Sequence, residues 1–569
     1  MSADGQFTAL AGEYLDELVR RHPDEATDLG DHRFDDRLPE RTRASLAAER
    51  LALGGFKARL AELTEPAGAT GAAGPDRTGP DSAGPDHAGP DRVLTPELAV
   101  DAAMLAEALD RRIFEIDELR EDEWDPLAAN PGRAIYGLVA RDFAPLPDRL
   151  VSVAGRLAQI PAALADARGL LDPAALPKVH LETAVGQFDG TIALISREIP
   201  EGTGPAKELA RARQAALTAL VEHRDWLRAR LTGGGDNARD SDFADPRIGP
   251  GKFARKLSLT LSAAAGADTI LARAEADLDR ATAEITALAS DLGGTPREVL
   301  DRLAADAPDG DTILRLAEDA FNAQVAFVTD HDLVTLYDDP IKLIPMPEID
   351  RGVAVAYCDS PGPLEQAPLP TFIAVSPPPE GWTADRVASF YREYNRHMAH
   401  NLMVHEAMPG HYLQLEHARR FGGGTKLRAA LSSGSFIEGW AVYAEELMAD
   451  HGYPGEGDPR AVRMQQLKMQ LRTIINAILD ARVHAHGMTE AEAMALMTGR
   501  GFQEEGEAAG KWRRALLTSA QLSTYYVGYT EVADLARELL AVPGASPRAV
   551  HDRILAHGSP PVRLLRQVI

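Results

Sequence analysis

Apolar positions recur at intervals of three and four residues along most of this 569-residue chain, the pattern of helices with one buried face. The interval holds from residue 7 to 63, except in a polar turn, ATDLGDHRFDDRLPE, at 26–40. It returns from 95 to about 231, in stretches such as LETAVGQFDGTIALI, and again from 252 to about 328. We therefore expect a mainly α protein.

The pattern changes near residue 341, where three short β-branched runs bounded by Pro and Gly follow one another: IKLIPMPEI, GVAVAYCD and PTFIAVSPPP. Runs of this kind are typical of short strands. We expect one small sheet at about 341–376. Helical periodicity resumes at Thr383 and continues almost to the end of the chain.

Two segments interrupt the helical series. Residues 74–91 repeat Gly-Pro-Asp four times with no apolar side chain larger than Ala, so they predict a disordered surface loop that carries no chemistry. Residues 232–251 contain TGGGDNARDSD and predict a loop or hinge. This divides the chain into an N-terminal helical region, 1–231, and a C-terminal region, 252–569, that includes the sheet.

Charge and composition exclude several classes of protein. Lys and Arg number 60 against 86 Asp and Glu, so the basic surface that nucleic acids and anionic membranes require is missing. The N-terminus lacks a basic stretch followed by an apolar one, and no run approaches the roughly 18 apolar residues of a membrane span. We expect a cytoplasmic protein without nucleic-acid or membrane partners; export without a recognisable signal is the alternative. With Cys358 as the single cysteine, any metal site must use His, Asp and Glu.

Histidines concentrate in one segment: five of the 16 lie within the 21 residues of 397–417, where an even spread would place fewer than one. At the centre stands HEAMPGH, with His405, Glu406 and His411. Many metallopeptidases present zinc on a His-Glu pair followed by a second His, with both imidazoles as ligands and the glutamate activating a water molecule. The segment therefore predicts a zinc site.

The spacing differs from the usual His-Glu-x-x-His, because six residues of regular helix turn through about 240° and would aim the two imidazoles apart. Pro409 lacks the N–H that bonds back along a helix, and Gly410 reaches conformations closed to other residues. We expect a helix break here that returns His411 to the metal. The other histidines of the segment should be solvated or should support the ligands: His397, His400 and His417.

A catalytic zinc keeps three protein ligands and one open position, so a third ligand is needed. Glu438 is the best candidate, because it opens a helical stretch, SFIEGWAVYAEEL, after the turn-forming residues 432–434. Val442 and Leu447 would hold this helix against the core, where a carboxylate is costly unless a cation compensates it. Glu445 shares a face with Glu438; its place in solvent or at the site stays open.

At these residues the sequence resembles the family of domain of unknown function 885, whose members are similar in length and look like helical zinc metallopeptidases of the gluzincin type. The resemblance runs over nearly the whole chain. Six blocks carry it: ATDLGDHRFDDRLPE (26–40), IPMPE (344–348), HEAMPGHYLQ (405–414), FIEGWAVYAE (436–445), DARVHAHGMT (480–489) and QLSTYYVG (521–528).

The resemblance implies a role for each matching residue: His405, His411 and Glu438 at the metal, Glu406 as general base, and His484 and Tyr525 in the substrate pocket. Tyr525 would donate a hydrogen bond to the oxyanion that forms when a carbonyl is attacked. The adjacent Tyr526 is the alternative for the tyrosine that faces the site.

Departures from the family pattern fall on the expected substrate side and put the substrate class in question. Asn476 replaces an arginine, Arg482 a glycine, Met488 a tryptophan, and 519–520 a Pro-Gly pair. The metal-site residues match the family pattern throughout.

The leading hypothesis is a zinc-dependent hydrolase that cleaves the amide bonds of short peptides, with residues 383–535 as its metal-binding catalytic core. Its partner would be a short peptide or small amide. One alternative is a metal-dependent hydrolase or lyase acting on a small amino-acid-like metabolite. Another is a non-catalytic helical binding protein whose metal is structural or absent. A di-iron bundle is disfavoured, because the paired Glu-x-x-His motifs it needs are missing.

The run PTFIAVS at 370–376 precedes the helix that carries His405, suits a strand by composition, and has prolines near both ends. We expect it to form a sheet edge beside the metal that binds an extended substrate by strand addition. Oligopeptides would then be cleaved and native proteins spared.

Overall fold

The computed structural model describes residues 2–64, 93–200, 206–232, 242–263, 265–347, 355–379 and 381–569. The Gly-Pro-Asp segment at 74–91 and residues 233–241 of the expected loop lie outside this part of the chain.

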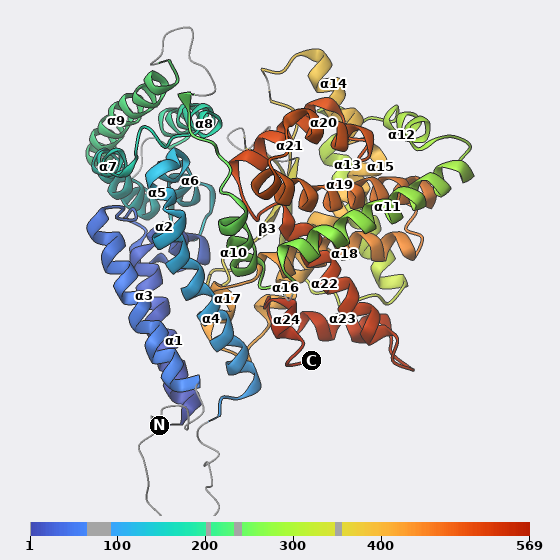
Figure 1. Ribbon diagram of the computed structural model, residues 1–569, viewed down its shortest axis with the longest axis horizontal. Coiled ribbons are helices and arrows are strands. Elements are labelled where there is room, and N and C mark those ends of the chain that lie inside the picture. The colour runs from blue at the N-terminus through green and yellow to red at the C-terminus, as the bar shows by residue number, and fades with distance from the viewer. Residues whose placement is uncertain are drawn as a thin grey trace, which may run out of the picture.

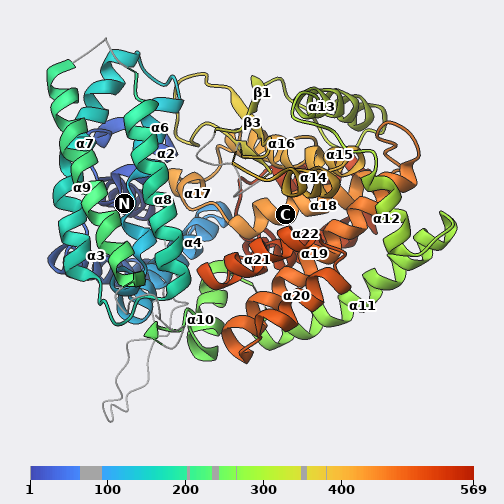
Figure 2. The same ribbon diagram turned by 90° about the horizontal axis from the view of Figure 1, so that it is seen from above.

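Two groups of helices lie side by side (Figures 1 and 2). The first, at the left in Figure 1, comprises α1 (Ala3–Arg21), α2 (Pro23–Leu29), α3 (Arg43–Thr64), α4 (Pro96–Phe114), α5 (Glu121–Trp124), α6 (Gly132–Ala140), α7 (Leu146–Leu170), α8 (Lys178–Arg197) and α9 (Ala206–Thr232). Single helical turns join them: η1 (His32–Phe34), η3 (Glu115–Leu119) and η4 (Pro126–Ala129).

The second group holds the sheet and the histidine-rich segment. It begins with α10 (Pro250–Leu261), α11 (Ala267–Asp291), α12 (Pro296–Ala304) and α13 (Ile313–Asp330), followed by β1 (Ile341–Pro345), β2 (Ala356–Asp359) and β3 (Thr371–Val375). The remaining helices are α14 (Ala384–Glu393), α15 (Arg396–Glu406), α16 (His411–Arg419), α17 (Lys426–Ala430), α18 (Gly434–Asp450), α19 (Pro459–His486), α20 (Glu490–Gly499), α21 (Glu505–Leu517), α22 (Ser523–Leu540), α23 (Pro547–Leu555) and α24 (Val562–Leu565).

The architecture is mainly α with one small sheet, as the periodicity predicts. The expected boundary at 232–251 falls between α9 and α10, and as a domain boundary it stays a prediction. The two groups are in contact, because α17 of the second packs on α1 and α4 of the first, with Leu427 in their shared core. The polar turn expected at 26–40 differs from the structure in one respect: residues 26–29 complete the short helix α2, which runs from Pro23 to Leu29 and is capped by Gly30.

The sheet has the strand order β1-β3-β2, with β1 parallel and β2 antiparallel to β3. The expectation that 370–376 forms a sheet edge is wrong, because β3 is the central strand and has neighbours on both sides. Four of its five residues are buried, which explains the β-branched and aromatic composition that suggested a strand. Prolines before and after the strand limit its length but do not prevent pairing along its sides.

Helices α18 and α22 make the closest helix pair near the histidine-rich segment. A Cβ atom on Gly528 of α22 would lie 1.9 Å from the carbonyl oxygen of Ser435, and one on Gly439 of α18 would lie 2.3 Å from the carbonyl carbon of Gly528. Only glycine allows this approach of two helix backbones. The two helices run in the same direction, because Gly434 faces Thr524 near their starts and Glu446 pairs with Arg537 further along.

The motif at 26–40 supports the loop between β2 and β3. Gly30 ends α2 with a φ of 85°, and a Cβ atom there would lie 2.4 Å from the backbone nitrogen of Glu365. From the opposite side, a Cβ on Gly362 would lie 2.3 Å from the carbonyl carbon of Leu29. The loop therefore rests directly on the end of α2.

His32 fastens the same loop. Its Nδ1 and Nε2 atoms lie 2.9 Å from the carboxylates of Asp35 and Glu365 respectively, and its ring stacks on Phe143. Burial alone would lower the pKa of His32, but the two carboxylates raise it above its usual value. A block that carries the family resemblance thus has a structural role, which is to hold the loop that leads into β3.

We expect the Gly528→Ala protein to be less stable than the wild type by about 2 kcal/mol or more, because the added methyl group forces α18 and α22 apart. Gly510→Ala is the matched control: Gly510 is exposed within α21 and has no atom within 4 Å of an added Cβ. This change should be neutral or stabilising by up to about 1 kcal/mol. Denaturant unfolding of both proteins tests the expectation, which equal midpoints would contradict.

Candidate metal centre

The His-Glu motif spans the end of one helix and the start of the next. Helix α15 ends at Glu406 and α16 begins at His411, so the predicted break at the Pro-Gly pair is confirmed. The Met408–Pro409 peptide bond is cis. A Cβ atom on Gly410 would lie 2.0 Å from the carbonyl oxygen of His405, so the chain can fold back this tightly only with glycine at that position.

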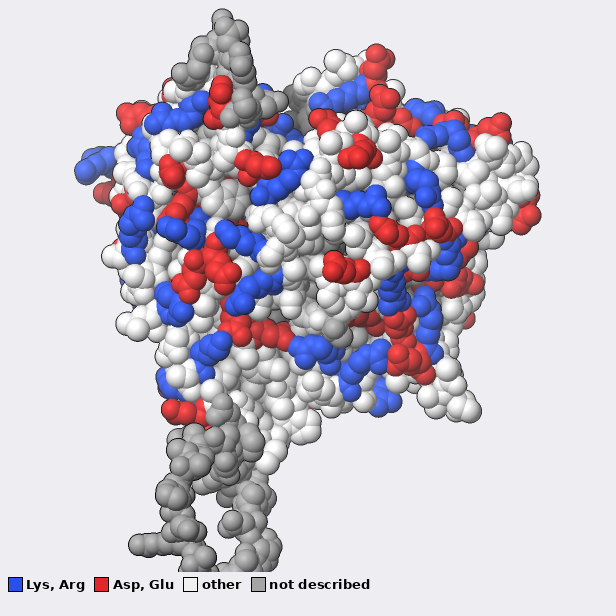
Figure 3. All heavy atoms as spheres, in the orientation of Figure 1, with Lys and Arg blue, Asp and Glu red and all other residues white. Residues whose placement is uncertain are grey.

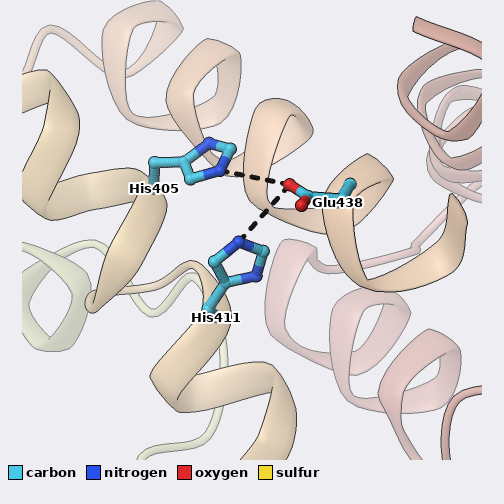
Figure 4. A group of neighbouring side chains, drawn as sticks. All are labelled: His405, His411 and Glu438. Carbon is cyan, nitrogen blue, oxygen red and sulfur yellow. Dashed lines mark ion pairs between the residues drawn. The ribbon is translucent and has the colours of Figure 1, made fainter. Parts of the chain in front are cut away.

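The break brings both imidazoles to the carboxylate of Glu438 (Figure 4). Glu438 Oε2 lies 3.4 Å from His405 Nε2 and 3.5 Å from His411 Nε2. The candidate ligand atoms of the three residues all lie within 4.8 Å of one another. Glu438 Oε2 is buried without a hydrogen bond, as expected of an atom that faces a metal position. The three predicted ligands are therefore brought together.

Two hydrogen bonds fix helix α18, which carries Glu438. Its first turn is capped by the Ser433 hydroxyl, which accepts a hydrogen bond of 3.3 Å from the N–H of Phe436. The indole N–H of Trp440 donates to the carbonyl oxygen of Pro409 at 2.8 Å, and so ties α18 to the break between the two histidines.

Glu445, two turns after Glu438, orients the first histidine. Its Oε1 lies 2.8 Å from His405 Nδ1, and its Oε2 accepts a 2.6 Å hydrogen bond from the side-chain amide of Asn401. A carboxylate on Nδ1 fixes the ring and leaves Nε2 as the ligand nitrogen. The sequence left the place of Glu445 open; its seven-residue spacing from Glu438 was the available signal. Asn401, four residues before His405, was missed.

Glu406 is buried beside the cluster and is held by the sheet. Its Oε2 accepts a 3.0 Å hydrogen bond from the backbone N–H of Cys358 in β2. Burial raises the pKa of Glu406, and the charges of His405, His411 and Glu438 also act on it. The small sheet therefore does lie beside the candidate site, through β2 rather than β3.

The charge balance of the cluster calls for a cation. Glu406, Glu438 and Glu445 bring three carboxylates together, and none of them pairs with a Lys or Arg within the described part of the chain. Two carboxylates hold the pKa of His405 well above its usual value despite burial, and the two imidazoles hold the pKa of Glu438 well below its usual value. Buried carboxylates are costly without a compensating cation, so these donors fit a divalent metal.

Tyr525 lies on the same side of the α18–α22 pair as Glu438. Successive helix residues are about 100° apart, so Glu438 points about 100° to one side of the contact at Gly439. Tyr525 lies three residues before Gly528, the residue of α22 that faces α18, so its side chain is rotated by about 60° in the opposite sense. Because the two helices face each other, these opposite rotations turn both side chains toward the same side of the pair. Its hydroxyl oxygen accepts a 3.1 Å hydrogen bond from Arg514.

Tyr526 points elsewhere, because its hydroxyl donates at 2.7 Å to Asp277 of α11. Of the two tyrosines, Tyr525 is therefore the one oriented toward the side of Glu438. Its role in catalysis stays a prediction.

A profile of the bacterial proteins of unknown function called DUF885 matches residues 23–569. The chain belongs to the DUF885 family. A search of curated proteins gives no match.

Two solved structures share the fold of this DUF885 chain. A candidate lipoprotein of unknown function from Shewanella oneidensis is 27% identical, with a TM-score of 0.77 and 99% of each chain covered. A candidate lipoprotein from Colwellia psychrerythraea is 15% identical, with a TM-score of 0.76, and the match covers 100% of this chain and 99% of that one.

Within the described residues of the DUF885 chain, no helix is both long and apolar enough to span a membrane. The names of the two relatives refer to lipoproteins, so a cytoplasmic location stays a prediction. On the face shown in Figure 3, Lys and Arg side chains lie among Asp and Glu rather than forming one basic patch. The expected absence of a nucleic-acid partner likewise stays a prediction.

His484 has the surroundings of a structural residue. It is buried, its Nε2 lies 3.0 Å from the carbonyl oxygen of Ala515 and 2.8 Å from that of Thr518, and its ring stacks on Phe253. Burial lowers the pKa of His484, and Asp480 acts against this shift. These contacts link α19 to the end of α21 and do not support a pocket role, which rests on the family resemblance alone.

The other histidines of the segment are outside the three-residue group. His400 is buried with its Nδ1 2.9 Å from the Tyr453 hydroxyl, and His417 is buried with its Nε2 2.8 Å from the carbonyl oxygen of Thr335. Neither is solvated, because both serve the packing of α15 and α16. His397 is half-buried.

We expect Glu445→Gln to lower the affinity for a divalent metal by about 10- to 100-fold, because the hydrogen-bond partner of a ligating histidine sets its basicity and orientation. Glu446→Gln is the matched control, since Glu446 binds Tyr529 and Arg537 instead of a candidate ligand. Competition titration against a chromogenic chelator measures both affinities. Equal affinities in the two variants would count against the assigned role of Glu445.

Proposed function

We propose that this protein is a zinc-dependent hydrolase that cleaves amide bonds of short peptides, with Glu406 as general base. One observation carries the proposal: the Nε2 atoms of two histidines and a carboxylate oxygen of Glu438 converge, beside a buried glutamate that is not one of the three. Two imidazoles and one carboxylate are a known ligand set of catalytic zinc, in which the fourth position stays open.

Zinc held by His405, His411 and Glu438 would supply a Lewis acid that polarises a carbonyl group and makes a water molecule more acidic. Glu406 is suited to accept the proton from that water. One of its oxygens is held by the N–H of Cys358, and burial makes the carboxylate a stronger base by raising its pKa. A purely structural metal site would have no use for this additional carboxyl group.

Tyr525 is suited to stabilise the oxyanion. Because its oxygen accepts a hydrogen bond from Arg514, its own proton remains available to donate to a substrate. Its position on the Glu438 side of α22 supports this role.

The edge of β2 that is turned away from β3 suits an extended substrate. The carbonyl of Val355 accepts from Ser376, so alternation along the strand turns the backbone groups of Ala356 and Cys358 away from β3. The hydrogen bond from the Cys358 N–H to Glu406 lies on this edge, which supports the proposal. A peptide lying along β2 would therefore pass Glu406.

We expect purified protein to hold about one zinc per chain, and Ala in place of His405, His411 or Glu438 to lower zinc content and peptidase activity together. His397→Ala, on the same helix as His405 but outside the ligand group, should leave both unchanged. Elemental analysis by mass spectrometry gives the metal content. Full zinc occupancy in the His411→Ala protein would refute the assigned ligands.

We expect Glu406→Gln to retain zinc and to lose at least about a hundredfold in kcat, since general-base catalysis typically contributes factors of 10² to 10⁴. The change preserves size, so the fold and the metal should survive it. Single-turnover and steady-state assays on a library of short peptides provide the comparison with wild type. An active Glu406→Gln enzyme would exclude the proposed base.

A further inference from the structure

Charged side chains from α14, α19 and α21 meet in the interior of the second helix group. The acidic side chains of this group form two ion pairs: Glu393 pairs with Lys468 at 2.9 Å, and Glu507 pairs with Arg472. Within the described residues each of these carboxylates thus has its own basic partner.

Two further basic groups in this region have no carboxylate partner among the residues that the structure describes. Lys511 is 5% exposed, and no carboxylate of the described residues lies within ion-pair distance of its ammonium group. Arg514 donates only to neutral groups, the side-chain amide of Gln521 at 2.9 Å and the hydroxyl of Tyr525 at 3.1 Å. In a chain with a formal net charge of −26, such basic groups without acidic partners are unexpected.

Lys511 and Arg514 lie on the same face of α21, because they are three residues apart. Burial lowers the pKa of Lys511 well below its usual value; the neighbouring Arg472 and Arg514 lower it further, and Glu507 acts against them. The ammonium form is thus destabilised in the free protein, and an anion bound there would restore it.

The location connects this pair to the candidate metal centre. Arg514 contacts Tyr525, and Tyr525 lies on the Glu438 side of the α18–α22 pair. A substrate whose reacting carbonyl lies near Glu438 would therefore extend past Tyr525 toward α21.

We propose that Lys511 and Arg514 form an anion subsite that receives the C-terminal carboxylate of a peptide substrate, so that cleavage takes place close to the C-terminus. An ammonium and a guanidinium together suit a carboxylate, since charge-assisted hydrogen bonds are among the strongest in proteins. The inference rests on the proposed function for the cleaved bond, but the binding of the carboxylate is independent of it.

Binding measurements on the Glu406→Gln protein test the subsite without requiring turnover. The probes are acetylated tripeptides with varied neutral side chains, each prepared as the free acid and as the C-terminal amide. A third set carries a C-terminal amide and a glutamate as last residue, which separates a side-chain carboxylate from the terminal one. Calorimetry should show the best free acid binding at least about tenfold more tightly than its amide.

Lys511→Met and Arg514→Gln, each placed in the Glu406→Gln protein, should reduce the preference for the free acid to about twofold or less. Arg514→Lys keeps a charge and should retain part of the preference. Arg513→Gln is the matched control: it removes the same charge from the same helix, but Arg513 binds Glu182 and Thr183 of α8. Lys511→Met removes a buried charge, so its thermal midpoint should not fall, and thermal melts verify that every variant folds.

The results separate this inference from the proposed function. Loss of the acid preference in the two variants, even without any peptide hydrolysis by wild type, supports the subsite and refutes only the hydrolase. Equal binding of acids and amides, no binding of either, a preference confined to the side-chain carboxylate, or a preference that survives Lys511→Met and Arg514→Gln would each overturn the subsite.

Discussion

Three carboxylates gather around two imidazoles, and this is the constraint on which the rest of the candidate site depends: Glu406 and Glu445 are buried, and Glu438 is half-buried with its Oε2 atom buried. Carboxylates lose much of their hydration when they are buried, and no basic side chain compensates Glu406, Glu438 or Glu445 within the described residues. Hydrogen-bond donors offset part of this cost: the side-chain amide of Asn401 donates to Glu445, and the backbone N–H of Cys358 donates to Glu406. What remains is an unsatisfied oxygen on Glu438 between two histidine nitrogens, which is where a divalent cation fits.

The residues of the candidate metal site were easier to predict from the sequence than the residues that position them. Helical periodicity predicted the mainly α fold, and the clustered histidines with a Pro-Gly pair predicted the convergence of His405 and His411, because helix geometry forbids it without a break. Glu438 followed from the cost of a carboxylate on a helix packed against the core. The fold, the helix break and the convergence of the three side chains are confirmed, because each depends on local residues and on general rules of geometry or solvation; their role as metal ligands stays a prediction.

The remaining features depend on contacts between distant segments, about which local patterns say little. Strand pairing order is one: the composition of β3 indicated a strand, but its place at the centre of the sheet is set by partners up to thirty residues away. His484 is another, since its carbonyl partners lie 31 and 34 residues further along the chain. The bond from Cys358 to Glu406 was not foreseeable either, because a backbone donor has no signature in the side-chain sequence.

The group that orients Glu406 is a main-chain amide, which any residue except proline would supply at position 358. Alanine scanning would leave it in place, and a comparison of related sequences would record no selection for it. The orientation of Glu406 depends on the path of the chain, and so on the docking of the β2–β3 loop against the end of α2. It can therefore be lost through changes far from His405, His411 and Glu438 while every motif residue stays intact.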